Sequence, residues 1–322
     1  MGVTLPAAEF LLAARKQGLE FGRTLTVGRQ WLMVSPFDTE KLLKKNGLWP
    51  DLSREQFFKD FAQIPAYLDP LLTVLGATSV SALDISNFEG ATLLHDLNRP
   101  IPTEWKGQYD FLFDGGSIEH VFNFPQAIRN YCDLVRVGGS IIIFTVANNF
   151  CGHGFYQFSP ELFYRVFSKE NGFELTRLVM AEDDVTWFRI GGFSIPVNVP
   201  GATYAAADPA AAHSRVELVN RRQTTILVQA RKVAEQTLFE TVPQQSDYIA
   251  AWKEKKEPDV QSVKSRARGL LKPVIERLSP AIMLHLQYKL APRFLRIMNP
   301  FLLRRWRGAE TFANKKIYRR IK

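Results

Sequence analysis

The chain has 322 residues, of which 46% are hydrophobic and 23% are charged, and its net charge is +9. This apolar fraction suffices for a buried core and excludes a globally disordered chain. Its two cysteines do not suggest a disulfide framework, and no Cys or His spacing predicts a metal site. No apolar stretch approaches the ~20 residues of a membrane span, and residues 1–12 lack the basic start of a secretory signal. We therefore expect a cytoplasmic protein whose first residues form a short amphipathic helix.

Short apolar runs alternate along the chain with segments of helical spacing. Strands are predicted at residues 23–28, 79–85, 91–95, 109–113, 140–146, 173–180 and 224–232. Helices are predicted at residues 38–45, 54–63, 66–75, 125–135 and 160–171. This alternation predicts an α/β domain over residues 1–240, with a doubly wound, mainly parallel, seven-stranded Rossmann-like sheet and a helical insertion at about 36–78. The last two strands have no helix between them, which favours an antiparallel closing pair. The alanine-rich residues 205–212 are expected to form a flexible loop.

Residues 109–158 are the most informative part of the sequence. They contain a strand, a loop, a helix, a glycine turn at 138–139 and a second strand, which is a βαβ unit. The two strands should therefore be parallel neighbours. Ligands in such sheets bind beyond the carboxyl ends of the strands. Residues 114–120 and 147–158 are both predicted to lie there.

The same segment resembles a known family. Residues 117–121 (SIEHV) and 134–139 (LVRVGG) match motifs of the class I S-adenosylmethionine-dependent methyltransferases of the small-molecule type, which are methyltransferase type 11-like. The resemblance extends over about residues 22–233. It implies S-adenosylmethionine as cofactor and methyl transfer to a small-molecule acceptor. We expect this acceptor to be a sugar or a lipid-linked glycan intermediate.

Three acids follow successive predicted strands and are candidate cofactor ligands: Asp84, Asp96 and Asp114. A carboxylate at the position of Asp84 has two oxygens to accept hydrogen bonds from both hydroxyls of a ribose. The alternative for Asp84 is a helix cap. The resemblance implies that Asp96 receives the adenine amino group and that Asp114 borders the cofactor.

The loop after the first strand departs from the family pattern. It reads Gly28, Arg29, Gln30 and has one glycine where the family has three. Gly28 would allow the backbone to approach the cofactor closely, Arg29 could pair with its carboxylate and Gln30 could donate a hydrogen bond. The alternative is that Arg29 and Gln30 only turn the chain and pack the insertion.

The loop after the fifth strand, residues 148–158, combines polar side chains, two glycines and aromatic rings. Its His153 is the candidate general base, because imidazole exchanges protons near neutral pH. His120 and Tyr156 are further catalytic candidates, with Glu119 beside them. The alternative is that the aromatic residues pack the loop while His153 caps a neighbouring helix.

Charge divides the chain into two parts. Residues 252–322 contain 19 Lys or Arg and five Asp or Glu, which gives +14 and leaves about −5 for residues 1–251. We expect a linker at 241–262 and a basic amphipathic helical tail at 263–322. Such a tail suits an anionic membrane surface on the inner face of the membrane. The alternatives are a basic face packed on a partner or on the domain itself, and nucleic-acid binding, which ranks lower because no such motif is present.

Three functions remain open from the sequence. The first is a methyltransferase, the second is a methyltransferase-like binding protein that has lost its cofactor, and the third is an adaptor attached to a membrane or nucleic acid through its tail. The single glycine of the first loop is the reason for the second, and the charge of residues 252–322 is the reason for the third.

Overall fold

A computed structural model describes residues 2–61, 66–190, 193–254, 312, 315 and 317–321. A single sheet forms its centre, with strand order β3-β2-β1-β4-β5-β8-β6-β7-β9 among the described residues. The strands are β1 (Gly22–Val27), β2 (Ala77–Asp84), β3 (Leu93–Leu94), β4 (Tyr109–Asp114), β5 (Val135–Asn148), β6 (Phe173–Ile190), β7 (Phe193–Ala206), β8 (Thr224–Lys232) and β9 (Tyr318–Arg320). All seven predicted strands are present, although β6 extends to Ile190, well beyond its predicted end at residue 180.

The sheet is mixed and has nine strands among the described residues, so the predicted α/β sheet is confirmed, whereas its seven mainly parallel strands are confirmed only in part. The pairs among β3, β2, β1, β4 and β5 are parallel. The pairs among β5, β8, β6, β7 and β9 are antiparallel. Strand β7 was not predicted because Pro196 and Pro200 interrupt its apolar pattern, and proline removes a backbone donor from a strand. The expected antiparallel closing pair is confirmed as β6 and β8.

The alanine-rich segment is ordered, contrary to the prediction of a flexible loop. Its first residues end β7, and the next ones form the short helix α7 (Pro209–Ala212). Asp208 caps this helix, since its carboxylate accepts a hydrogen bond of 2.9 Å from the backbone of Ala210. The predicted turn at residues 138–139 is instead a bulge within β5, where the pairing with β4 shifts between Tyr109 and Phe111.

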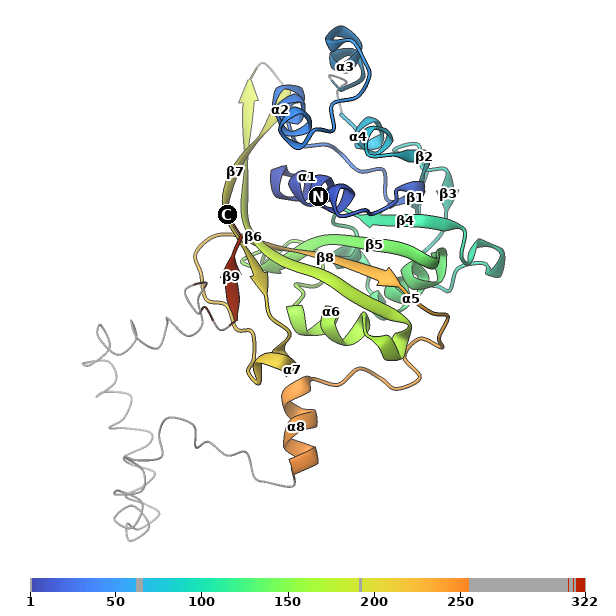
Figure 1. The fold of residues 1–322 in the computed structure, drawn as a ribbon, viewed down its shortest axis with the longest axis vertical. Helices are drawn as coiled ribbons and strands as arrows, with labels where there is room; N and C mark the ends of the chain where they lie inside the picture. Colours follow the sequence, from blue (N-terminus) through green and yellow to red (C-terminus); the bar gives the residue numbers. More distant parts are fainter. Residues whose placement is uncertain are drawn as a thin grey trace, which may run out of the picture.

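Helices cover both faces of the sheet (Figure 1). They are α1 (Leu5–Lys16), α2 (Pro36–Asn46), α3 (Arg54–Phe61), α4 (Asp69–Val74), α5 (Phe124–Leu134) and α6 (Pro160–Val166). Helix α8 (Ser246–Glu254) projects away from the sheet beside α7. Helices α1 to α4 share one core cluster with Phe111 and Phe113, while α5 and α6 share the other with Leu112. Because both faces of β4 are buried, the residues Phe111, Leu112 and Phe113 are all apolar and do not alternate with polar residues.

The tail prediction falls mostly outside the described residues. Helix α8 lies within the predicted linker at 241–262, and residues 263–311 are not described. Residues 318–320 form strand β9 rather than the predicted helix, since they pair with β7 and Tyr318 is buried against the domain. The ring of Phe312 stacks on that of Tyr204, with 3.9 Å between the ring centres. The membrane-surface role of the tail stays a prediction. Among the described residues, no helix has both the length and the apolar character that crossing a membrane requires.

Candidate functional site

The strand order reverses between β1 and β4, and polar groups converge at that point. Gly28 follows β1 with a φ of 68°, and its N–H donates to the carbonyl of Leu83 at 2.7 Å. A side-chain carbon at Gly28 would lie 3.5 Å from Nε2 of Gln30, 3.5 Å from Oγ of Ser117 and 3.7 Å from Oδ2 of Asp84. These groups come from the ends of β1, β4 and β2. Such a reversal is where ligands bind in doubly wound sheets.

Asp84 caps a turn with one oxygen, and its predicted ligand role concerns the other. Its Oδ1 caps the turn after β2, accepting hydrogen bonds from Ile85 N (2.6 Å) and Ser86 N (3.3 Å). Its Oδ2 faces Gly28 and accepts no hydrogen bond from the described residues. The half-buried carboxylate therefore keeps one oxygen for a ligand hydroxyl.

Gln30 lies beside the same point and is nearly inaccessible to solvent. Its Nε2 donates to the carbonyl of Val27, which fixes the amide. Its Oε1 is buried and accepts no hydrogen bond from the part of the chain that the structure describes. An unsatisfied buried acceptor is costly, at about 1–3 kcal/mol. Oε1 lies against Gly115, whereas Nε2 is the atom of Gln30 that lies nearest to Gly28. The predicted hydrogen bond from Gln30 to a cofactor stays a prediction.

Arg29 is engaged in packing. Its guanidinium lies 3.9 Å from the ring centre of Tyr67, donates to the carbonyl of Glu89 at 3.4 Å and approaches Asp69 at 3.7 Å. Tyr67 and Asp69 belong to the segment between β1 and β2. Arg29 therefore joins this insertion to the loop after β2, as in the alternative interpretation, and does not face Gly28.

Asp96 orders its own loop. Its Oδ1 accepts hydrogen bonds from the backbone and side-chain nitrogens of Asn98 at 2.9 and 2.8 Å. The pKa of Asp96 is lowered, first by the side-chain hydrogen bond from Asn98. Asn98 in turn accepts from the backbone of Asn123 at 2.8 Å. The carboxylate thus holds together the loops that follow β3 and precede α5.

Asp114 is buried and fully occupied, so it is not available to a ligand as predicted. Its carboxylate accepts hydrogen bonds from the backbone N–H groups of Gly116, Ser117 and Ile118 at 3.0, 2.7 and 3.0 Å. The hydroxyl of Tyr131 donates to it at 2.9 Å. Asp114 shapes the loop that carries Ser117 and the residues after it.

Glu119, His120 and His153 form one cluster at the ends of β4 and β5. Nε2 of His153 lies 3.5 Å from Oε1 of Glu119, and the two imidazole rings are 5.0 Å apart. Glu119 is fully buried, and its Oε2 accepts a hydrogen bond from Thr145 at 2.7 Å. Burial lowers the pKa of His120, although the charge of Glu119 opposes this. The structure thus brings together His120 and His153, which the sequence predicted as catalytic.

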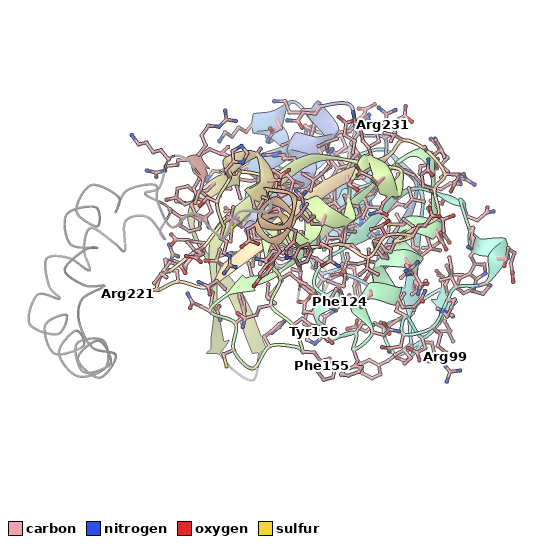
Figure 2. All side chains as sticks on the ribbon, turned by 90° about the horizontal axis from the view of Figure 1, so that it is seen from below. Arg99, Phe124, Phe155, Tyr156, Arg221 and Arg231 are labelled. Atoms are coloured by element: carbon pink, nitrogen blue, oxygen red, sulfur yellow. The ribbon has the colours of Figure 1, made fainter. Side chains whose placement is uncertain are left out.

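The third catalytic candidate has a structural bond. The hydroxyl of Tyr156 donates to the carbonyl of Phe122 at 2.7 Å. Its ring lies 4.9 Å from that of Phe124 and 6.4 Å from that of Phe155, and Figure 2 shows these three rings together at one edge of the molecule. Phe122 and Phe155 are 70% and 65% exposed. Tyr156 therefore supports an aromatic rim beside the histidines.

Two glycines of the loop offer a test of its position. Gly152 and Gly154 both have positive φ, of 87° and 69°. A side-chain carbon at Gly154 would lie 2.7 Å from the carbonyl oxygen of Glu119, whereas one at Gly152 would meet nothing within 4 Å. Both alanine variants carry a similar backbone cost, so the clash separates them. We expect Gly154→Ala to unfold about 1–3 kcal/mol more easily than Gly152→Ala in urea denaturation. Equal stabilities would mean that the loop does not sit against Glu119.

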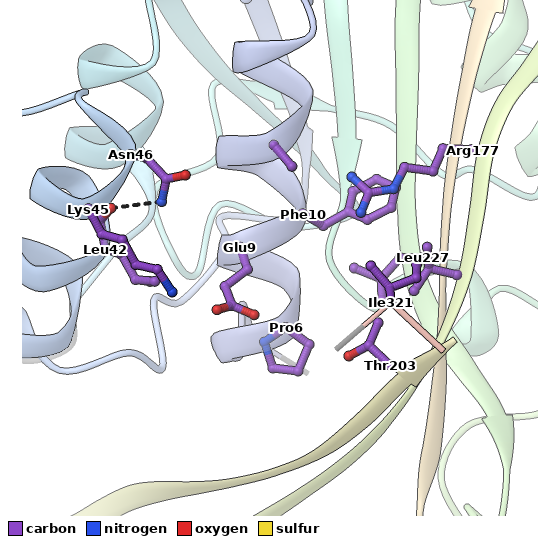
Figure 3. Close-up of a pocket in the computed structure, with 12 residues that line it drawn as sticks. Pro6, Glu9, Phe10, Leu42, Lys45, Asn46, Arg177, Thr203, Leu227 and Ile321 are labelled. Atoms are coloured by element: carbon purple, nitrogen blue, oxygen red, sulfur yellow. Dashed lines mark hydrogen bonds between the residues drawn. The ribbon is translucent and has the colours of Figure 1, made fainter. Parts of the chain in front are cut away.

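A separate cleft of about 220 Å³ lies between helices α1 and α2 and the strands β6 and β8 (Figure 3). Arg177 lines it, with its guanidinium 4.5 Å from the ring centre of Phe10, and Glu9 and Lys45 are on the opposite side. Burial lowers the pKa of Arg177. None of the predicted site residues lines this cleft, so it is distinct from the site at the strand ends.

Sequence reasoning missed Ser117 and Thr145. Ser117 donates a hydrogen bond of 2.9 Å to the carbonyl of Val27 and so ties the β4 loop to the β1 loop. Its signal was its place in the SIEHV motif. Thr145 is a hydroxyl inside the apolar run of β5, and a fully buried hydroxyl needs a polar partner.

No protein-family model matches the sequence, and no curated protein matches it. Three solved structures illustrate what the chain is similar to. The first is a branched-chain polyamine synthase from Thermus thermophilus, with 14% identity, 76% of this chain and 61% of that chain covered, and a TM-score of 0.36. The second is the 1,6-didemethyltoxoflavin-N1-methyltransferase of Burkholderia thailandensis, with 11% identity, 71% of this chain and 78% of that chain covered, and a TM-score of 0.34. The third is TehB from Haemophilus influenzae, with 12% identity, 69% of this chain and 61% of that chain covered, and a TM-score of 0.33. Similarity at this level assigns no activity to the chain.

Proposed function

We propose that the protein binds S-adenosylmethionine at the ends of β1, β2 and β4 and transfers its methyl group to a small-molecule acceptor. The observation that carries the proposal is the convergence of Asp84, Gln30 and Ser117 on Gly28 at the reversal of strand order. Asp84 offers a carboxylate oxygen that can accept a hydrogen bond from a ribose hydroxyl, and Gly28 offers backbone that a ligand can approach closely, which fits a nucleoside.

The geometry disfavours a dinucleotide at the same place. Dinucleotide sites set the pyrophosphate on a helix that begins directly after the first strand and its three glycines. Here residues 28–35 separate β1 from α2, and they contain one glycine. The ligand at this point should therefore have an adenosine-like part without a pyrophosphate.

Methyl transfer requires little side-chain chemistry, because the sulfonium of the cofactor already activates the methyl group. The chain's part is to hold the acceptor in line and to manage its proton. The cluster of Glu119, His120 and His153 lies in the loops that follow β4 and β5, beside the exposed rings of Phe122 and Phe155. Aromatic faces beside polar groups suit a ring that is apolar on one side and carries hydroxyls, so we propose a sugar or lipid-linked glycan as acceptor.

A titration with S-adenosylhomocysteine tests the proposal. We expect the wild-type chain to bind, and Asp84→Ala to weaken binding by about 1.5–3 kcal/mol, because a charged hydrogen-bond acceptor is lost. Isothermal titration calorimetry on the folded proteins measures the affinity of the wild type and that of Asp84→Ala. Asp60→Ala is the matched control, since Asp60 is an exposed acid on α3 bonded to Gln56.

Two outcomes would contradict this. Equal affinity of the wild type and Asp84→Ala would remove Asp84 from the site. No binding by the wild type at millimolar ligand would end the enzyme proposal and favour a binding protein that has lost the cofactor. NAD⁺, titrated in parallel, should not bind.

A further inference from the structure

The cluster of Glu119, His120 and His153 contains an unsatisfied buried carboxylate oxygen. Oε1 of Glu119 and Nε2 of His153 are both buried, and neither makes a hydrogen bond to the described part of the chain. The second oxygen of Glu119 is held by Thr145 at 2.7 Å. Oε1 of Glu119 and Nε2 of His153 lie 3.5 Å apart, within ion-pair range but without hydrogen-bond geometry, and one metal ion between them would satisfy both.

From this geometry we propose that Glu119, His120 and His153 bind one divalent transition-metal ion. One ligand atom from each residue lies within 4.8 Å of the other two. Ligands about 2.1 Å from a tetrahedral ion are roughly 3.4 Å apart. The 3.5 Å between Glu119 and His153 already matches this spacing. His120 must move closer, which its exposed side chain permits.

The backbone holds these ligands together although they are far apart in sequence. Glu119 and His120 are adjacent in a short 3-10 helix, Ile118–His120. The N–H of Phe155 donates to the carbonyl of Glu119 at 2.7 Å, which brings the loop of His153 against that helix. Within the loop, the N–H of His153 donates to Phe150 at 3.0 Å and closes a turn. The positions of Glu119 and His153 are thus set before an ion binds, and only the side chain of His120 has to move.

The donor set selects the class of metal. Two imidazoles and one carboxylate suit Zn²⁺, Co²⁺, Ni²⁺ or Fe²⁺, whereas Mg²⁺ and Ca²⁺ prefer oxygen ligands throughout. Thr145 would orient the carboxylate from outside, as partners of metal ligands commonly do. Three protein ligands leave a position for a water or a substrate atom, which is typical of catalytic rather than structural sites.

This inference does not depend on the proposed methyl transfer, since metal binding is measured without cofactor. In the combined reaction, the ion would hold the acceptor oxygen and lower its proton affinity. His153 would then act as a ligand and not as the base.

The test uses the full chain without an affinity tag, stripped with a chelator and titrated with Co²⁺ and Zn²⁺. We expect one equivalent per chain, with visible Co²⁺ absorption bands of a low-coordinate site. Glu119→Gln and His153→Ala should each weaken binding by at least about 100-fold, and Thr145→Val by about 10-fold. Denaturation midpoints confirm that each variant is folded, and Glu119→Gln keeps the size of the side chain.

Two variants serve as matched controls. His213→Asn removes an exposed imidazole elsewhere at a φ of 48°, which asparagine tolerates, and should bind like the wild type. Cys151→Ser removes the exposed thiol of the same loop and should also bind normally. No binding by the wild type at near-stoichiometric metal, or unchanged binding by Glu119→Gln, would overturn the proposal. Loss of binding in Cys151→Ser would assign the ion to a different ligand set.

Discussion

His153→Ala is expected to lower kcat by about 100-fold or more while leaving the affinity for S-adenosylhomocysteine nearly unchanged. The physical reason is the position of His153, 3.5 Å from the buried carboxylate of Glu119 and in the loop that follows β5. Whether His153 accepts a proton or holds a metal ion, it acts on the methyl acceptor and not on the cofactor. The Gly28 side of the site, where Asp84 and Gln30 lie, should be undisturbed.

Turnover is measured as S-adenosylhomocysteine release with the best acceptor from a panel of hydroxyl-bearing and amine-bearing sugars. Tyr156→Phe is the matched loop variant, because it removes a hydroxyl that bonds to Phe122 rather than a reacting group. It should reduce kcat far less than His153→Ala does. A His153→Ala enzyme with full activity would assign His153 to structure.

The role of Glu119 can be separated by a double variant. If Glu119 and His153 act as one unit, Glu119→Gln combined with His153→Ala should be no slower than either single variant. Chelation then distinguishes the two roles of His153. Activity that is lost with a chelator and restored by Zn²⁺ or Co²⁺ supports the metal site, whereas activity indifferent to chelation supports a base oriented by Glu119.

The centre of the fold could be predicted because its strands are buried on both faces. The run at Tyr109–Asp114 is mainly aromatic and aliphatic, the run at Thr224–Lys232 is rich in β-branched residues, and each is bounded by a turn signal. The second half of the sheet was less predictable. Strand β7 contains prolines, and β9 pairs with it from the far end of the chain, so tertiary contacts rather than local pattern decide both.

The site shows the same division. The carboxyl ends of the strands could be located from the sequence, and Gly28 and Asp84 do meet there. The direction of each side chain could not be. Asp114 and Asp84 both follow a strand, yet one turns into its own loop and the other faces Gly28. Glu119 has the appearance of a surface acid until the loop of Phe155, distant in sequence, covers it.

Asp114→Ala should lower the free energy of unfolding by about 4 kcal/mol or more. The variant would leave three buried backbone N–H groups and the Tyr131 hydroxyl without their acceptor. Each unsatisfied buried donor costs about 1–3 kcal/mol, and water entry would offset part of this. Urea denaturation measures the change. Tyr131→Phe, which removes one of the four donors, should cost only about 1–2 kcal/mol and remains measurable if the alanine variant does not fold.

Asp133→Ala is the matched control, because that carboxylate makes a partly exposed ion pair of 2.9 Å with Lys106. Such pairs contribute less than about 1 kcal/mol. Losses of equal size in Asp114→Ala and Asp133→Ala would contradict a central role for the buried carboxylate. Equal losses would also mean that contacts other than those of Asp114 keep residues 115–120 ordered.

The cost of Asp114→Ala should depend on pH in a direction that follows from burial. Burial, followed by the charge of Glu119, raises the pKa of Asp114 to about 7, against about 3.9 in an unfolded chain. Between these values the folded state keeps a proton that the unfolded state has lost. The contribution of Asp114 to stability is therefore present below about pH 4 and is lost as the pH rises to about 7, by up to about 1.4 kcal/mol per pH unit. With a chelator present, the difference between wild type and Asp114→Ala should shrink from pH 5 to pH 8. A constant difference would mean that the carboxyl is already ionised at pH 5, because its hydrogen bonds outweigh its burial.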